Sequence, residues 1–175
     1  ALLLEAQFIK QYAPRYNVAL RDDKRYLVLC IDMSEDFPRF DFCRLKRDDQ
    51  RLYFGPYPHA YALRETVRFL ETEFGLRSCP VRSPDEECRK HCLEHVLRQC
   101  SSPCNGSITK EAYRERLEKA LSILRGEESA RQMIITLHAK MHEAAAELDF
   151  EKAAKLRDIV EHLQTVVEPA RRFVN

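Results

Sequence analysis

The cysteine-rich segment between Cys79 and Cys104 constrains the fold of this chain more than any other feature. It holds five of the seven cysteines, together with three prolines and few apolar residues. Such a segment buries too little apolar surface to fold on side-chain packing alone, so thiolate ligation of a metal ion or cluster is the leading prediction. Two C-x3-C pairs, Cys88 with Cys92 and Cys100 with Cys104, are compatible with a tetrahedral zinc site.

Charge and hydropathy narrow the class of protein. Glu5 and Lys10 interrupt the apolar stretch that opens the chain, so we expect no signal peptide, and no run of about 18 apolar residues predicts a membrane span. Without a secretory signal, and with an odd number of cysteines, a cytoplasmic metal site is favoured over a disulfide framework. Because the net charge is only +1, any contact with nucleic acid must come from local patches. Arg64, Arg68 and Arg77 are expected to form surface ion pairs.

The first half of the chain contains short strands. Residues 26–32 form an apolar run of strand length, and residues 37–45 alternate between apolar and polar side chains, so an antiparallel hairpin is predicted. Cys30 and Cys43 lie on these two strands and are interpreted as buried core thiols rather than ligands. The glycine and prolines of YFGPYP, residues 53–58, are expected to break the strand pattern.

Helical periodicity accounts for most of the remaining chain. A helix is expected over residues 2–12, and another is expected over residues 60–74, with Gly75 well placed to end it. Thr109 is the predicted N-cap of a further helix, which Gly126 closes. The fold class is therefore α+β, with a helix, short antiparallel strands, the cysteine-rich segment and a C-terminal antiparallel helical hairpin.

Two narrow apolar stripes define that C-terminal hairpin. Both have heptad-like spacing, and Asp149 between them is the natural N-cap of the second helix. A hairpin of about 40 residues buries little surface alone and is expected to need a partner. The two stripes comprise Ile134, Leu137, Met141, Ala144 and Leu148 in the first helix, and Ala153, Leu156, Val160, Leu163 and Val167 in the second.

Four stretches of the sequence together resemble one protein family. They are LLLEAQFIKQYAPRYNVALRDDK, YFGPYPHAYALRETVRFL, CLEHVLRQCSSPC and MHEAAAELDFEKAAKLRDIV, in that order along the chain. The chain resembles the UvrC excinuclease family of bacterial nucleotide excision repair. The resemblance implies an internal fragment in three parts: the end of a GIY-YIG nuclease domain over 1–57, a cysteine-rich segment with its flanking helices over 58–126, and a UvrB-binding UVR hairpin over 127–170.

The resemblance also implies nuclease residues near the start of the chain. Glu5 is placed as the carboxylate that holds a divalent cation, Mg²⁺ or Mn²⁺, for 3′ incision of damaged double-stranded DNA, and Asn17 is placed near the same active site. A solvated helix residue and a turn-forming Asn are the alternatives. Arg15, Arg21 and Lys24 could contact phosphate or could be a solvated loop. Because the family's GIY and YIG tyrosines and catalytic arginine are absent, this chain alone is predicted to make no incision.

For the cysteines, the resemblance implies a particular ligand set. Family members carry a [4Fe–4S] cluster on a C…C-x7-C-x3-C pattern, which here leaves Cys88 over, and the long first spacing also suits a cluster better than a zinc knuckle. Zinc remains the alternative, and a structural role is expected. The implied ligands are Cys79, Cys92, Cys100 and Cys104.

The last implication concerns the hairpin. Phe150 begins the second helix at the tip, where its own unit covers it poorly, and the resemblance implies that this tip docks on a matching hairpin of UvrB. A self-associating coiled coil is the alternative for the hairpin, and a non-catalytic interaction module with a four-cysteine zinc site is the alternative for the whole chain. The implied docking residues are Leu148, Phe150, Ala153, Ala154, Leu156 and Arg157.

Overall fold

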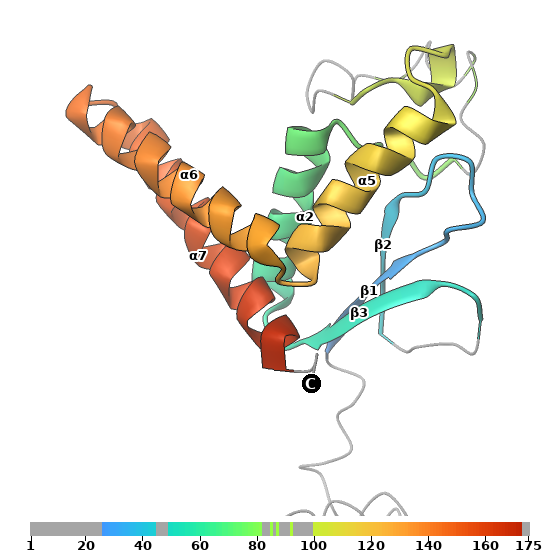
Figure 1. The fold of residues 1–175 in the computed structure, drawn as a ribbon, viewed down its shortest axis with the longest axis horizontal. Coiled ribbons are helices and arrows are strands. Elements are labelled where there is room, and N and C mark those ends of the chain that lie inside the picture. The colour runs from blue at the N-terminus through green and yellow to red at the C-terminus, as the bar shows by residue number, and fades with distance from the viewer. Residues whose placement is uncertain are drawn as a thin grey trace, which may run out of the picture.

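A computed structural model describes residues 26–44, 49–81, 85, 87, 92 and 100–172 of the chain. Over these residues the fold is α+β, as predicted: a three-stranded antiparallel sheet lies beside the helices α2 and α5, and a long helical hairpin projects from them (Figure 1). The helix predicted at 2–12 lies outside the described residues. The division of the chain at residues 57 and 126 stays a prediction.

The strand β1 forms the centre of the sheet. The strands β1 (Leu27–Ile31), β2 (Phe40–Cys43) and β3 (Leu52–Tyr57) are arranged in the order β2-β1-β3. All five residues of β1 are buried, which explains its continuous apolar sequence. The predicted hairpin is confirmed, because β1 and β2 pair in antiparallel register.

The strand β3 corrects the expectation that YFGPYP breaks the strand pattern. Residues 52–57 pair with β1, from Ile31 opposite Leu52 to Leu27 opposite Tyr57, with a register shift between Leu27 and Leu29. A proline is tolerated in a strand at the edge of a sheet or at an irregularity of the ladder, and β3 offers both conditions.

The helices α2 and α5 begin and end as their sequences predict. The helix α2 (Ala60–Phe74) ends at Gly75, which adopts the left-handed conformation with φ 63°. The helix α5 (Lys110–Leu124) begins after Thr109, whose side-chain oxygen accepts a hydrogen bond from the backbone N–H of Ala112 at 3.3 Å. A short 3₁₀ helix, η1 (Pro103–Asn105), precedes it.

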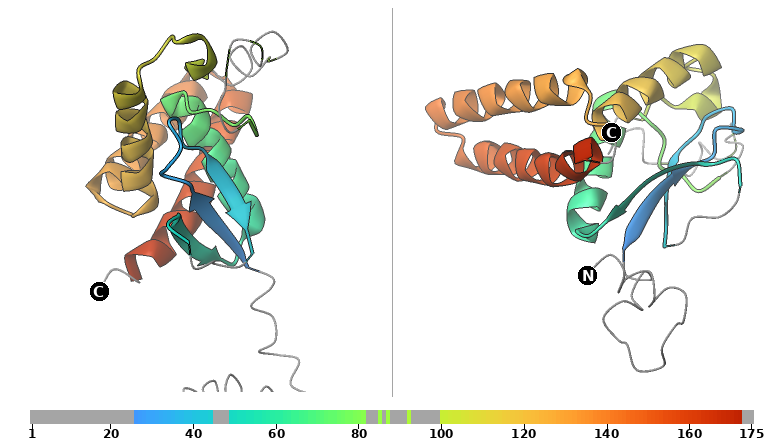
Figure 2. Two further views of the ribbon diagram at one scale, coloured as in Figure 1. Left: turned by 90° about the vertical axis from the view of Figure 1, so that its right-hand side faces the viewer. Right: turned by 60° about the horizontal axis from the view of Figure 1, so that its bottom comes forward.

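The predicted helical hairpin is formed by α6 (Glu128–Ala146) and α7 (Phe150–Arg172), which run antiparallel (Figure 2). Asp149 is the N-cap of α7, because its carboxylate accepts a hydrogen bond from the backbone N–H of Lys152 at 3.1 Å. No helix in the described part of the chain is both long enough and apolar enough to cross a membrane.

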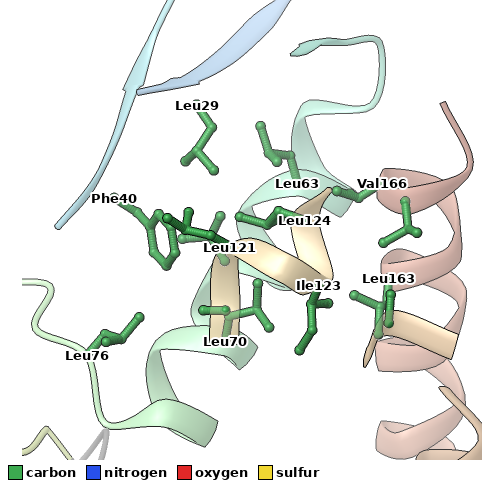
Figure 3. Packing of buried hydrophobic residues seen from close by; sticks show 14 of the residues in the cluster. Leu29, Phe40, Leu63, Leu70, Leu76, Leu121, Ile123, Leu124, Leu163 and Val166 are labelled. Carbon is green, nitrogen blue, oxygen red and sulfur yellow. The ribbon is translucent and has the colours of Figure 1, made fainter. Parts of the chain in front are cut away.

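One hydrophobic core joins the sheet, α2, α5 and the base of the hairpin (Figure 3). Leu29 from β1, Leu63 from α2 and Leu121 from α5 are fully buried in it, and Leu163 from α7 is buried in the same cluster. The apolar stripe at the base of the hairpin is therefore covered by other elements of the same chain. The opposite end of the hairpin extends away from this core (Figure 1).

Candidate functional site

The tip of the hairpin exposes two large apolar side chains close together in sequence. Leu148 is 72% exposed and Phe150 is 66% exposed, whereas Leu163 and Val167 near the base of α7 are buried. Exposed apolar side chains that stand singly are ordinary, whereas this neighbouring pair at the end of a projecting hairpin is a candidate contact surface. The prediction that the hairpin covers Phe150 poorly is confirmed.

Backbone hydrogen bonds fix the shape of the tip. The N–H of Leu148 donates to Ala145 O at 3.1 Å and the N–H of Asp149 donates to Ala144 O at 2.9 Å, which closes α6. Leu148 itself has a φ of 61°, in the left-handed region that a branched residue adopts at a cost of about 1–2 kcal/mol. Because Phe150 begins α7 only two residues after Leu148, the turn places both apolar residues at the same end of the hairpin.

The first two turns of α7 contain the other predicted docking residues. Ala153, Ala154 and Leu156 are half-buried, and Arg157 is exposed. Arg157 pairs with Asp158 through its Nη2 at 2.8 Å, and this hydrogen bond, with the adjacent charge, raises the pKa of Arg157. Charged residues therefore flank the apolar tip, which is the usual composition of the rim of a protein interface.

The four cysteines implied as ligands occupy similar environments. Cys79, Cys92, Cys100 and Cys104 are all half-buried thiols. Burial raises the pKa of Cys100, and the charges of Cys79, Cys104 and Cys92 raise it further, while a hydrogen bond with the backbone of Ser102 lowers it. Cys88 lies outside the described residues.

This set of sulfur donors suits a thiolate-bound zinc ion or iron–sulfur cluster. Across the described ranges, no group of three or more His, Cys, Asp or Glu side chains is already arranged to hold a metal ion. The fit of these residues to such a group therefore rests on the chemistry of the sulfur donors and not on their placement. A metal bound here would cross-link the cysteine segment.

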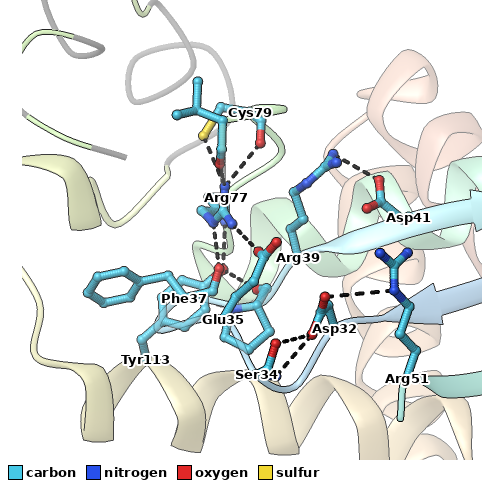
Figure 4. A network of polar contacts seen from close by, with 12 residues as sticks. Asp32, Ser34, Glu35, Phe37, Arg39, Asp41, Arg51, Arg77, Cys79 and Tyr113 are labelled. Carbon is cyan, nitrogen blue, oxygen red and sulfur yellow. Dashed lines mark hydrogen bonds and ion pairs between the residues drawn. The ribbon is translucent and has the colours of Figure 1, made fainter. Parts of the chain in front are cut away.

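Arg77 is the main correction to the expected surface ion pairs. Arg68 pairs with Glu65 at the surface at 2.9 Å, as predicted, but the side chain of Arg77 is only 1% exposed. The Arg77 guanidinium reaches Glu35 and the backbone of Phe37 on the β1–β2 connection, and the residues that begin the cysteine segment (Figure 4). The sequence around Arg77 carries no signal of this burial.

Tyr113 on α5 completes the network around Arg77. Its hydroxyl accepts a hydrogen bond from the backbone N–H of Arg77 at 3.1 Å and donates one to Pro38 O at 2.9 Å. The ring also packs edge-on against Phe37, with centroids 5.3 Å apart. Burial raises the pKa of Tyr113 well above its usual value, so the hydroxyl stays protonated and able to donate.

The two cysteines of the sheet differ in burial. Cys30 is buried, as predicted, and burial together with a hydrogen bond to the Cys43 side chain raises its pKa to about 11. Cys43 is only half-buried, because it ends β2 at the edge of the sheet, so the prediction of a core thiol was wrong in degree for this residue.

The predicted nuclease residues lie outside the described residues. Their positions relative to the cysteines and the hairpin therefore stay predictions. These residues are Glu5, Asn17, Arg15, Arg21 and Lys24.

Two protein-family models match adjacent parts of the chain, and both describe UvrC proteins or motifs. The model of the UvrC/Cho excinuclease middle domain matches residues 26–123, and the model of the UvrB/uvrC motif matches residues 131–166, which include the tip. No solved structure matches the chain.

Curated relatives match almost the whole chain. UvrABC system protein C of Desulforudis audaxviator is 42% identical over 98% of this chain, and that of Clostridium acetobutylicum is 41% identical over 99%. The protein of the same name from Moorella thermoacetica is 41% identical over 96% of the chain. The chain spans about 28% of the length of the first two relatives and 27% of the third.

Proposed function

The chain belongs to the UvrC excinuclease family, and on that premise we propose that it recruits its parent protein to UvrB through the tip of the α6–α7 hairpin. The parent would then incise damaged double-stranded DNA in bacterial nucleotide excision repair, in the cytoplasm. The observation that carries the docking role is the exposure of Leu148 and Phe150 at the tip, inside the residues that match the UvrB/uvrC motif.

The distribution of burial along the hairpin supports docking at the tip. The base of α7 is buried against the rest of the chain through Val160, Leu163 and Val166, so this end is already covered. At the tip, Phe150 offers a rigid aromatic side chain that a helical pair on the partner could enclose. The ion pairs of Arg157 with Asp158 and Lys155 with Glu151 surround it with charges that could fix the orientation of the partner.

Replacing Phe150 by Ala should weaken binding to UvrB by about 2–4 kcal/mol, which is about 30- to 800-fold in Kd, because a central aromatic anchor is lost. Isothermal titration calorimetry with purified UvrB measures this change. Ile135→Ala is the matched control, since Ile135 is 55% exposed on α6 but lies away from the tip. Unchanged binding by Phe150→Ala would rule out the docking assignment.

We propose that Cys79, Cys92, Cys100 and Cys104 hold a [4Fe–4S] cluster with a structural role, with zinc as the alternative metal. The half-burial of the four thiols and the electrostatic influence of the other three on Cys100 support this. Iron, sulfide and zinc are measured in protein purified without oxygen. About four iron and about four sulfide ions per protein chain are expected for such a cluster. One zinc ion per chain without iron would refute it.

We further propose that Glu5 holds the Mg²⁺ or Mn²⁺ ion of the nuclease site, with Asn17 nearby and with Arg15, Arg21 and Lys24 on DNA phosphates. In the full-length parent, Glu5→Ala should abolish 3′ incision and leave assembly of the damage complex intact, because only the metal site is lost. Glu73→Ala on the exposed face of α2 is the control. Retained incision by the Glu5 variant would count against the metal role.

A further inference from the structure

Arg77 lies where three parts of the chain meet, and its environment calls for an explanation beyond packing. A buried guanidinium carries a large desolvation cost unless its charge is paired and its N–H groups are bonded. Glu35 supplies the counter-charge, with its Oε2 2.5 Å from Nη2 of Arg77, and Phe37 O accepts from Nε at 2.5 Å. These two contacts hold the guanidinium against the β1–β2 connection.

The other donors of Arg77 point toward the cysteine segment. Its Nη1 is 3.1 Å from the carbonyl oxygen of Cys79 and 3.6 Å from the Sγ of the same residue, and it also donates to Val81 O. One nitrogen therefore contacts the backbone on both sides of Pro80 and the sulfur of the first candidate ligand. Figure 4 shows Cys79 on the opposite side of the guanidinium from Glu35 and Phe37.

The far end of the cysteine segment returns to the same place. The backbone N–H of Ser101 donates to Gly75 O at 2.9 Å, so the residue after Cys100 is attached to the end of α2. The Arg77 backbone is in turn held by the Tyr113 hydroxyl of α5. Residues 75–77 thus contact both Cys79 and the residue that follows Cys100.

We propose that Arg77 is the positioning residue of the four-cysteine site: its planar guanidinium sets the position of Cys79 and donates a charge-assisted hydrogen bond to its thiolate when a metal is bound. The inference rests on the proposed metal site but does not depend on whether iron or zinc fills it. Glu35 neutralises the net charge of Arg77, so the directional hydrogen bonds, rather than a long-range field, account for the effect.

The test compares Arg77→Met and Arg77→Lys with the wild-type chain, all purified without oxygen. Retained metal is measured against graded concentrations of a chelator, together with the thiolate-to-metal charge-transfer absorption. Outer-sphere partners of metal ligands change metal affinity by about 10- to 100-fold, and a loss of that size is expected for Arg77→Met. The metal affinity of Arg77→Lys should lie between those of the wild type and Arg77→Met, because an ammonium can still donate a hydrogen bond to Cys79 but lacks the planar guanidinium fork.

Arg68→Met is the matched control, since Arg68 is an exposed arginine of α2 that pairs with Glu65 of the same helix, and it should retain metal as the wild type does. A purely structural role would lower the thermal midpoint of Arg77→Met without moving the absorption band or the chelator curve, and that result would overturn the proposal. If Arg77→Met proves unfolded by circular dichroism, Arg77→Lys decides: a shifted chelator curve supports the proposal and an unchanged one contradicts it. A wild-type chain without metal would refute the proposed site itself.

Discussion

Arg68 and Arg77 belong to one stretch of sequence and lie in opposite environments. Arg68 pairs with a neighbour on its own helix, so the spacing of the sequence is enough to predict its ion pair. Arg77 is buried by Glu35, Phe37 and Tyr113, which are distant along the chain and reach it only through the tertiary fold. Its role could not be predicted because no local pattern records those contacts.

Tyr57, at the end of β3, should make the stability of the fold decrease as the pH rises in the alkaline range. It is 4% exposed, and burial raises its pKa from 10.0 to about 12. In this interval the unfolded chain loses the phenolic proton while the folded chain keeps it, so the stabilisation is complete below pH 10 and is lost as the pH rises through 12. We expect the Tyr57 hydroxyl to account for a loss of about 2 kcal/mol between about pH 9 and about pH 12.

Urea unfolding of the wild type and of Tyr57→Phe at the two ends of this interval measures that loss. Other buried groups also titrate there, including Cys30 with its pKa of about 11, so the difference between the two proteins isolates the tyrosine. Tyr57→Phe should lose less stability than the wild type by about 2 kcal/mol. Equal losses in the two proteins would show that the Tyr57 hydroxyl does not titrate in this way.

Among the elements, the ends of the helices could be predicted from local sequence signals, whereas the strand β3 could not. Thr109, Gly75 and Asp149 occupy the caps that their residue types predict, because capping depends on neighbours within a few positions. The strand β3 was missed because Gly55 and Pro56 are turn residues by propensity. Only the pairing with β1, together with a place at the edge of the sheet, makes a strand of them.

A Leu→Ala substitution should change the free energy of unfolding much more at the base of the hairpin than at its tip. Leu163→Ala at the buried base should lower the free energy of unfolding by about 2–5 kcal/mol, because it leaves a cavity in the shared core. Leu148→Ala at the exposed tip should change it by no more than about 0.5 kcal/mol. Urea unfolding measures both variants.

Binding of the same two variants to UvrB provides the reciprocal check. Leu148→Ala should weaken binding, while Leu163→Ala should retain the wild-type affinity under conditions where it is folded. A large loss of stability in Leu148→Ala would mean that the tip packs within the chain and is not free to dock.

On the scale of the whole molecule, the fold buries the base of the hairpin in the shared core and leaves its tip projecting. The heptad-like stripes predicted the hairpin itself, but its junction depends on Leu163 and Val166 fitting against α2 and α5, which no sequence spacing reveals. The proposed docking residues of α7 were predicted from a resemblance, and they occupy the first two turns of that helix. The nuclease residues, from Glu5 to Lys24, keep the status of proposals.

Hydrogen exchange of the chain with and without UvrB, followed by mass spectrometry, tests the central claim most directly, because it locates the contact without any substitution. The amides of residues 148–157 should exchange more slowly in the complex, since docking suppresses opening of the turn and of the first turns of α7. The amides of residues 128–138, at the base of α6, should exchange at the same rate in both states. Protection confined to the base, or equal exchange at the tip with and without bound UvrB, would contradict docking through Leu148 and Phe150.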